Sequence, residues 1–139
     1  IAFGTLGAAR DCLETAIDYS LSRVQFDSPI AAYQLTQRKL ADMTVQWGNG
    51  MLLALHLGRL KDAHAVRPEQ ISLGKYNNAK VALDIARESR SILGGNGITL
   101  EYPIIRHMNN LESVFTYEGT HEMHSLVIGE ALTGIAAFR

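Results

Sequence analysis

The chain has 139 residues, of which 47% are hydrophobic and 19% are charged, a balance typical of a globular protein that buries a core. Its formal net charge of −1 argues against a nucleic-acid-binding protein, which normally carries a basic excess. The single cysteine, Cys12, excludes an internal disulfide, and its apolar surroundings predict a small buried side chain. No apolar run reaches the roughly 18 residues that would suggest a membrane span.

The first third of the chain predicts two helices joined by a loop. Apolar residues recur mostly at steps of three and four, which predicts an amphipathic helix from near the start to about Arg23. The pattern breaks over 25–33, where Pro29 follows Asp27 and Ser28, so this segment is expected to be a connecting loop. Because the chain opens at Ile1, within the helical pattern and without an initiator methionine, we expect a piece of a longer protein.

A second helix is expected from about Leu35 to Ala65. Its apolar residues cover far more than half of its circumference, a pattern typical of a helix that is buried on both sides. One side would pack in the bundle, and the other side could pack against a partner subunit. Pro68 is tolerated in a first helical turn and is followed by Glu69, so a third helix is predicted from Pro68 to about Leu93.

The last third of the chain predicts two shorter helices and two special turns. Three glycines in the segment 94–97 permit positive φ angles and are expected to stop the third helix. A short helix is predicted from Pro103 to Ser113, then a turn over 116–120, then a final helix from about His121 to Ala137. Since no useful β-alternation or repeat is visible, the predicted fold class is all-α, an up-down four-helix bundle over 1–139.

Taken alone, each notable side chain has a structural explanation. Glu118 could be an acidic residue favoured near the start of a helix, and Thr120 an ordinary N-cap. Arg23 would be a cation at the end of any helix. His121 and His124 are three residues apart and could share one helical face, but no further metal ligands accompany them, so no metal site is predicted.

Four segments in register resemble the C-terminal domain of the acyl-CoA dehydrogenase family across essentially the whole chain. They are Arg23–Phe26 with Pro29 and Gln34, Leu93–Gly97, Tyr117–Thr120 and Leu132–Ile135. Three longer stretches, Lys39–Met43, Ala82–Arg87 and Thr116–His121, are similar to the glutaryl-CoA dehydrogenase branch in particular. The resemblance implies that the N-terminal helical and middle β-domains of the family are absent from this chain, and that the chain alone would be inactive.

The resemblance implies that Glu118 is the catalytic base. Removal of a proton α to a thioester needs a base in a dry pocket, where desolvation would raise the pKa of a carboxylate. In the family this glutamate abstracts the α-proton while the β-hydride passes to flavin N5, and its backbone N–H helps to hold the thioester carbonyl. Gly119 would let substrate approach the backbone closely. Tyr117 could line the acyl pocket or serve packing alone.

The resemblance also implies an FAD site built from several segments. Arg23, Phe26 and Gln34 would reach the pyrophosphate and adenine side of FAD bound in a neighbouring subunit, since a planar guanidinium suits phosphate oxygens. The full implied cofactor set is Arg23, Phe26, Gln34, Ser91, Ile92, Leu93, Gly94, Gly95, Thr120, His121, Glu122 and Phe138. Two positions depart from the family pattern: Asp27 replaces a common glycine, and Ser91 stands where many relatives carry glutamine.

The implied activity is FAD-dependent oxidation of glutaryl-CoA, followed by decarboxylation of the glutaconyl intermediate to crotonyl-CoA. Electrons would leave through an electron-transfer flavoprotein, and the protein would be a homo-oligomer, a tetramer as in the family. The implied location is the cytoplasm in a bacterium or the mitochondrial matrix in a eukaryote. Two alternatives stay open: a helical assembly module without catalytic activity, and a dehydrogenase for another acyl-CoA.

Overall fold

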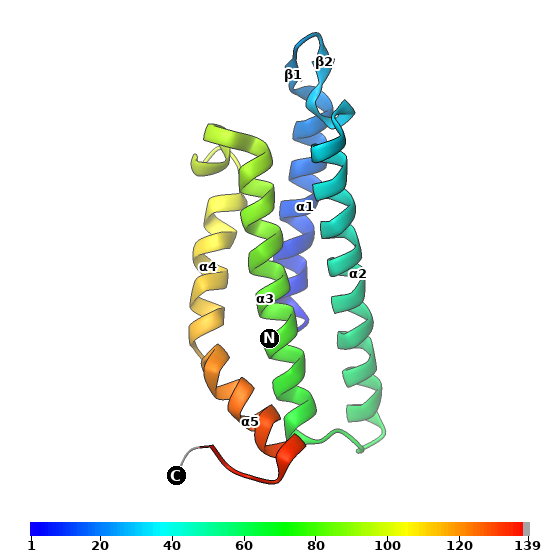
Figure 1. Ribbon diagram of the computed structural model, residues 1–139, viewed down its shortest axis with the longest axis vertical. Coiled ribbons are helices and arrows are strands. Elements are labelled where there is room, and N and C mark those ends of the chain that lie inside the picture. The colour runs from blue at the N-terminus through cyan, green and yellow to red at the C-terminus, as the bar shows by residue number, and fades with distance from the viewer. Residues whose placement is uncertain (138–139) are drawn as a thin grey trace.

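Five α-helices make up most of the computed structural model, which describes residues 1–137 (Figure 1). They are α1 Gly4–Ser22, α2 Gln34–Asp62, α3 Pro68–Leu93, α4 Ile104–Thr116 and α5 His121–Thr133. Short 3₁₀ helices cover Ile30–Ala32 and Gly94–Ile98. The predicted all-α class is therefore confirmed.

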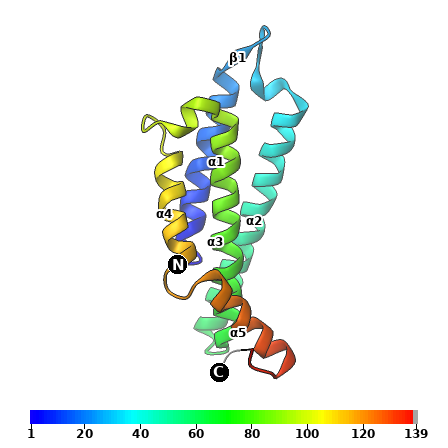
Figure 2. The ribbon, with the colours of Figure 1, turned by 60° about the vertical axis from the view of Figure 1, so that its left-hand side comes forward.

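The helices α1, α2 and α3 run side by side along the long axis, and α4 and α5 follow one another along α3 (Figures 1 and 2). The bundle thus has four helical positions, and the turn between α4 and α5 divides the fourth of them. The hairpin between α1 and α2 lies at one end of the molecule, and α5 lies at the other. Among the described residues, no helix combines the length and the apolar character needed to cross a membrane.

The core lies where α1, α3 and α4 meet, with α2 contributing Met43. Its buried residues are Ala9, Cys12, Leu13, Ala16, Met43, Ala82, Leu83, Ile85, Ala86, Leu93, Ile104 and Leu111. Each fully buried Leu, Ile or Met stabilises the fold by about 1.5–3 kcal/mol relative to an exposed position. Cys12 is completely buried as predicted, and burial, with a smaller effect of the Asp11 charge, raises its pKa to about 12. The thiol therefore stays protonated at neutral pH.

The loop predicted over 25–33 contains a small antiparallel hairpin. Strand β1, Val24–Gln25, pairs with strand β2, Ser28–Pro29. Phe26 and Asp27 form the tip with φ angles of 51° and 61°, a conformation that glycine adopts more easily. A glycine at position 27 would adopt this positive φ angle without the steric cost that Asp27 has.

Some helix ends differ from the predicted ones. The final helix ends at Thr133 rather than at Ala137, because Gly134 adopts φ 73° and donates its N–H to the Glu130 carbonyl in a helix-ending cap. The second helix ends at Asp62 rather than at Ala65. The helix predicted over Pro103–Ser113 covers Ile104–Thr116 instead. Pro68 and Gly94 marked the two ends of α3 correctly, whereas the prediction overlooked Gly134 as the end of α5.

Helix α2 is less buried than its apolar pattern predicts. Only Met43 and Gly50 are buried along it, while Val45, Leu52 and Leu55 are 62%, 67% and 49% exposed. One side of α2 packs on the bundle, and the other side is open in this chain. That a partner covers the open side remains a prediction.

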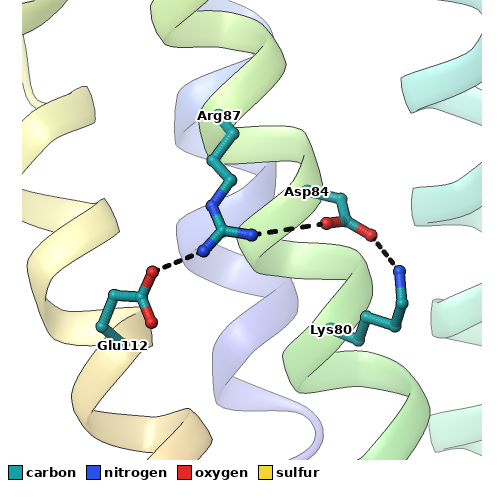
Figure 3. Close-up of polar contacts among 4 residues, drawn as sticks. All are labelled: Lys80, Asp84, Arg87 and Glu112. Atoms are coloured by element: carbon teal, nitrogen blue, oxygen red, sulfur yellow. Dashed lines mark hydrogen bonds and ion pairs between the residues drawn. The ribbon is translucent and has the colours of Figure 1, made fainter.

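A chain of ion pairs joins α3 to α4 on the surface (Figure 3). Arg87 lies 2.6 Å from a carboxylate oxygen of Glu112 and 3.9 Å from one of Asp84, which also pairs with Lys80 at 2.5 Å. Exposed pairs of this kind typically contribute only about 0–1 kcal/mol each. The network therefore helps to fix the register of α4 on α3, but it is not the main source of stability.

Candidate functional site

The turn between α4 and α5 holds its backbone in an unusual conformation. Glu118 has φ 57° and Gly119 has φ 86°, so both residues lie in the left-handed region. For a residue with a Cβ atom this conformation costs about 1–2 kcal/mol. Such strain persists only where the surroundings impose it, and it is concentrated at functional sites.

The two helices that flank the turn set its ends. The Tyr117 N–H donates to the Ser113 carbonyl at 2.9 Å and closes α4. The Thr120 hydroxyl accepts a hydrogen bond from the Met123 N–H at 3.3 Å, so Thr120 is the N-cap of α5, as predicted. Between these ends, no hydrogen bond within residues 1–137 occupies the backbone N–H of Glu118. That donor is free to bind a ligand.

A buried lysine on α3 donates hydrogen bonds to the backbone of the turn. Lys75 is only 6% exposed, and its Nζ donates to the carbonyl oxygens of Tyr117 and Gly119, the latter at 2.6 Å. Burial lowers the pKa of Lys75, and the nearby Glu118 carboxylate opposes that change. Lys75 was missed by the sequence reasoning. The available signal was a lysine four residues before Ala79 and seven before Ala82, on the buried stripe of the helix.

A cavity of about 490 Å³ lies beside the turn and is lined mostly by apolar groups. Its lining residues are Ile1, Ala2, Phe3, Ala54, Leu57, Gly58, Lys61, Val66, Ile71, Lys75, Glu118 and His124. Glu118 is therefore a carboxylate at the edge of an apolar space that could hold a hydrocarbon chain. Glu118 itself is exposed in this chain, so the dry environment predicted for it would have to come from groups beyond these residues.

The two histidines of α5 have different surroundings. The His121 ring is stacked between Tyr76 and Phe115, with ring centroids 3.8 Å and 4.2 Å away, and burial lowers its pKa. His124 places its Nε2 against Gly119, where a Cβ atom on the glycine would lie 3.0 Å from that nitrogen. This Nε2 is buried without a hydrogen-bond partner among the described residues, and burial, then the Lys75 charge, lowers the His124 pKa. The His121 ring therefore packs between α3 and α4, whereas the His124 ring packs against the turn at Gly119.

A second cavity, of about 450 Å³, brings together two segments of the predicted cofactor set. Its lining residues are Tyr19, Arg23, Gln25, Ile30, Ser91, Ile92, Leu93, Gly94, Gly95 and Asn96. Arg23 forms no ion pair with any residue in the described range 1–137, so its guanidinium is available for an anion. Across the cavity, the Ser91 hydroxyl accepts a hydrogen bond from Lys39 at 3.0 Å.

Other predicted cofactor residues are not gathered at this cavity. Phe26 is 90% exposed at the hairpin tip, Gln34 is exposed at the start of α2, and Glu122 is exposed on the first turn of α5. Asp27, which replaces a glycine common in the family, is also absent from the cavity lining. The Leu93 side chain is buried in the core, so only its backbone could contact a ligand. Phe138 lies outside the described residues.

The site residues therefore form two groups, one near the hairpin and the end of α3, and one at the turn before α5. These regions occupy different ends of the bundle (Figures 1 and 2). A large cofactor could contact both groups only if it extended along the bundle or if different subunits contributed the two groups.

Comparisons with known proteins show the family and the fold of this chain. Residues 1–133 match the family described as acyl-CoA dehydrogenase, C-terminal domain. A crystal structure of glutaryl-CoA dehydrogenase from Mycobacterium smegmatis is 67% identical, with a TM-score of 0.98, over 100% of this chain and 36% of that one. A structure of a glutaryl-CoA dehydrogenase from the same organism in complex with FADH2 is 70% identical, with a TM-score of 0.97, over 99% of this chain and 36% of that one.

A more distant relative is the short-chain specific acyl-CoA dehydrogenase of Megasphaera elsdenii. It is 34% identical over 95% of this chain and 34% of its own length. The chain thus spans about a third of the length of the relatives that it matches.

Proposed function

We propose that this chain, which belongs to the acyl-CoA dehydrogenase family, forms the C-terminal helical domain of an FAD-dependent enzyme that oxidises glutaryl-CoA. The observation that carries the proposal is the turn at Glu118. It presents a carboxylate and a free backbone N–H beside a mostly apolar cavity. The high identity to glutaryl-CoA dehydrogenases over the whole chain supports this acyl group over others.

In the proposed reaction, the Glu118 carboxylate removes the proton from the carbon α to the thioester. The Glu118 N–H, which has no hydrogen-bond acceptor among residues 1–137, would donate to the thioester oxygen and stabilise the charge that develops there. FAD, when bound, supplies the acceptor for the hydride from the β-carbon. Loss of carbon dioxide from the resulting glutaconyl thioester, with protonation of the carbon chain, gives crotonyl-CoA.

The cavity at Arg23 has the chemistry of a phosphate-bearing cofactor site. The Arg23 guanidinium, which has no ion-pair partner in the described part of the chain, lines one space with a serine hydroxyl and a glycine-rich backbone segment. These groups suit the pyrophosphate of FAD, because a guanidinium can hold two phosphate oxygens at once. We therefore assign the phosphate contacts to Arg23 and the Ser91–Gly95 segment. An electron-transfer flavoprotein is the proposed acceptor of the electrons.

The proposed activity is tested with the purified full-length protein. Addition of glutaryl-CoA should bleach the flavin absorbance, and turnover with an electron acceptor should release crotonyl-CoA. Release of glutaconyl-CoA would remove the decarboxylation step from the proposal. Faster bleaching by butyryl-CoA would favour a dehydrogenase for another acyl chain, and an absence of flavin would favour the assembly module.

We also propose that the full-length protein is a homo-oligomer, with tetramer as the expected state. The open side of α2 carries Val45, Leu52 and Leu55, and α5 carries Leu132, which is 82% exposed. Large exposed apolar groups of this kind often mark protein interfaces. Light scattering should therefore give a mass well above that of one chain, and a stable monomer at micromolar concentration would contradict the proposal.

A further inference from the structure

Lys75 is a buried ammonium group in a helical bundle, and such groups are rarely fully buried without partners. It lies on α3, while its hydrogen-bond acceptors lie more than forty positions later, in the turn between α4 and α5. The tertiary fold therefore brings the Lys75 side chain to the backbone of a turn that is distant in the sequence.

The partners of Lys75 are the two carbonyl groups on either side of Glu118. Its Nζ donates to the Tyr117 oxygen and, at 2.6 Å, to the Gly119 oxygen. The same Nζ lies 5.6 Å from the centre of the Tyr117 ring, within the range of a cation–π contact. Holding both carbonyls restricts the peptide units that carry the N–H of Glu118 and of Thr120, which are the units on either side of the Glu118–Gly119 peptide bond.

This restraint acts where the backbone is strained. Glu118, which has a Cβ atom, would relax from φ 57° toward common conformations if nothing opposed it, whereas Gly119 adopts φ 86° without steric cost. The His124 ring also packs against the turn, at Gly119. Lys75 holds the turn by hydrogen bonds, and the His124 ring limits by steric contact how far Gly119 can move. Together the two side chains restrict the position of the Glu118 backbone.

We propose that Lys75 is a positioning residue that fixes the Glu118 carboxylate and backbone N–H in the geometry needed for proton removal. This inference rests on the proposed function of Glu118. Both hydrogen-bond acceptors of Lys75 belong to the turn that carries Glu118, so its effect on Glu118 passes through the turn. A misplacement of about 1 Å at a reacting group can cost about 10²-fold in rate.

The test replaces Lys75 in the full-length enzyme with methionine, which keeps most of the side-chain length but has no donor. Flavin reduction by saturating glutaryl-CoA should slow by about 10²-fold, while KM and FAD content change little, because the lost effect belongs to the transition state. The matched control is Lys80→Met, the same change on the same helix at an exposed lysine that pairs with Asp84. The control should reduce flavin at the wild-type rate.

A double-variant comparison separates positioning from general damage. If Lys75 acts through Glu118, the part of its effect that passes through the carboxylate is already lost in a Glu118→Gln background, so Lys75→Met should cost less there than in the wild type. Fully additive losses would overturn the inference. The inference would also be overturned if the single variant Glu118→Gln reduced flavin slowly while the single variant Lys75→Met reduced it at the wild-type rate. That outcome would leave the proposed function standing. Conversely, a fast Glu118→Gln variant would overturn the proposed function first.

A second substitution covers the case in which Lys75→Met does not fold. Lys75→Gln retains an N–H donor without the charge and should show an intermediate rate with a cooperative melt. If neither variant folds, Lys75 is a folding element rather than a positioning residue, and the inference is wrong.

Discussion

Replacing Glu118 by glutamine in the full-length protein should slow flavin reduction by glutaryl-CoA by about 10²–10⁴-fold, the usual contribution of a positioned general base. The amide keeps the size of the side chain but cannot accept the α-proton. The left-handed backbone at Glu118 does not depend on the carboxylate, and the Lys75 contacts are made by neighbouring carbonyls. FAD and acyl-CoA binding should therefore be nearly unchanged. Stopped-flow measurement of flavin bleaching gives the rate.

The matched control for this variant is Glu112→Gln on α4. Glu112 is an exposed carboxylate that pairs with Arg87 at 2.6 Å on the outer face of the bundle (Figure 3). Its replacement should leave the rate of flavin reduction unchanged and should cost at most about 1 kcal/mol of stability. If Glu118→Gln reduced the flavin as quickly as this control, Glu118 would not be the base.

Replacing Arg23 by alanine in the full-length protein should weaken FAD binding by about 10- to 100-fold. A hydrogen bond to a charged group typically contributes about 1.5–3 kcal/mol, and about 1.4 kcal/mol corresponds to tenfold in affinity. Arg23 is suited to this role because it lines the cavity with the Ser91–Gly95 segment and has no ion-pair partner among residues 1–137. Isothermal titration of FAD into the apoprotein measures the change.

Arg10→Ala provides the control, on the helix α1 that Arg23 directly follows. Arg10 pairs with Glu14 at 2.7 Å, and both side chains are more than half exposed, so its loss should leave FAD affinity unchanged. Arg23→Lys should fall between wild type and Arg23→Ala, because an ammonium keeps the charge but not the two-pronged geometry. Equal affinities for Arg23→Ala and Arg10→Ala would remove Arg23 from the cofactor site.

Local sequence chemistry predicted most of the fold. Helical periodicity identified α1 and α3, and Pro68 marked the first residue of α3, because proline is tolerated there. Glycine at 94 marked the end of the same helix. The N-cap role of Thr120 was also predictable, since a hydroxyl just before a helix accepts from a free N–H. These features depend on neighbours within one or two helical turns.

The apolar periodicity of the sequence did not predict correctly how much of α2 is buried. Its apolar pattern predicted two packed sides, but one side of α2 is open in this chain. Periodicity shows which faces of a helix favour burial, but it does not say which surface covers each face. That information belongs to the arrangement of other helices or other subunits.

By itself, the sequence determined the helices, their main boundaries and the motif that presents Glu118, because these follow from residue types close together in the chain. Only the tertiary structure decided that Lys75 reaches the carbonyls around Glu118 and that His121 lies between Tyr76 and Phe115. It also decided that Arg23 shares a cavity with the Ser91–Gly95 segment. Each of these contacts joins residues on different helices, and helix packing, rather than local pattern, sets which side chains meet.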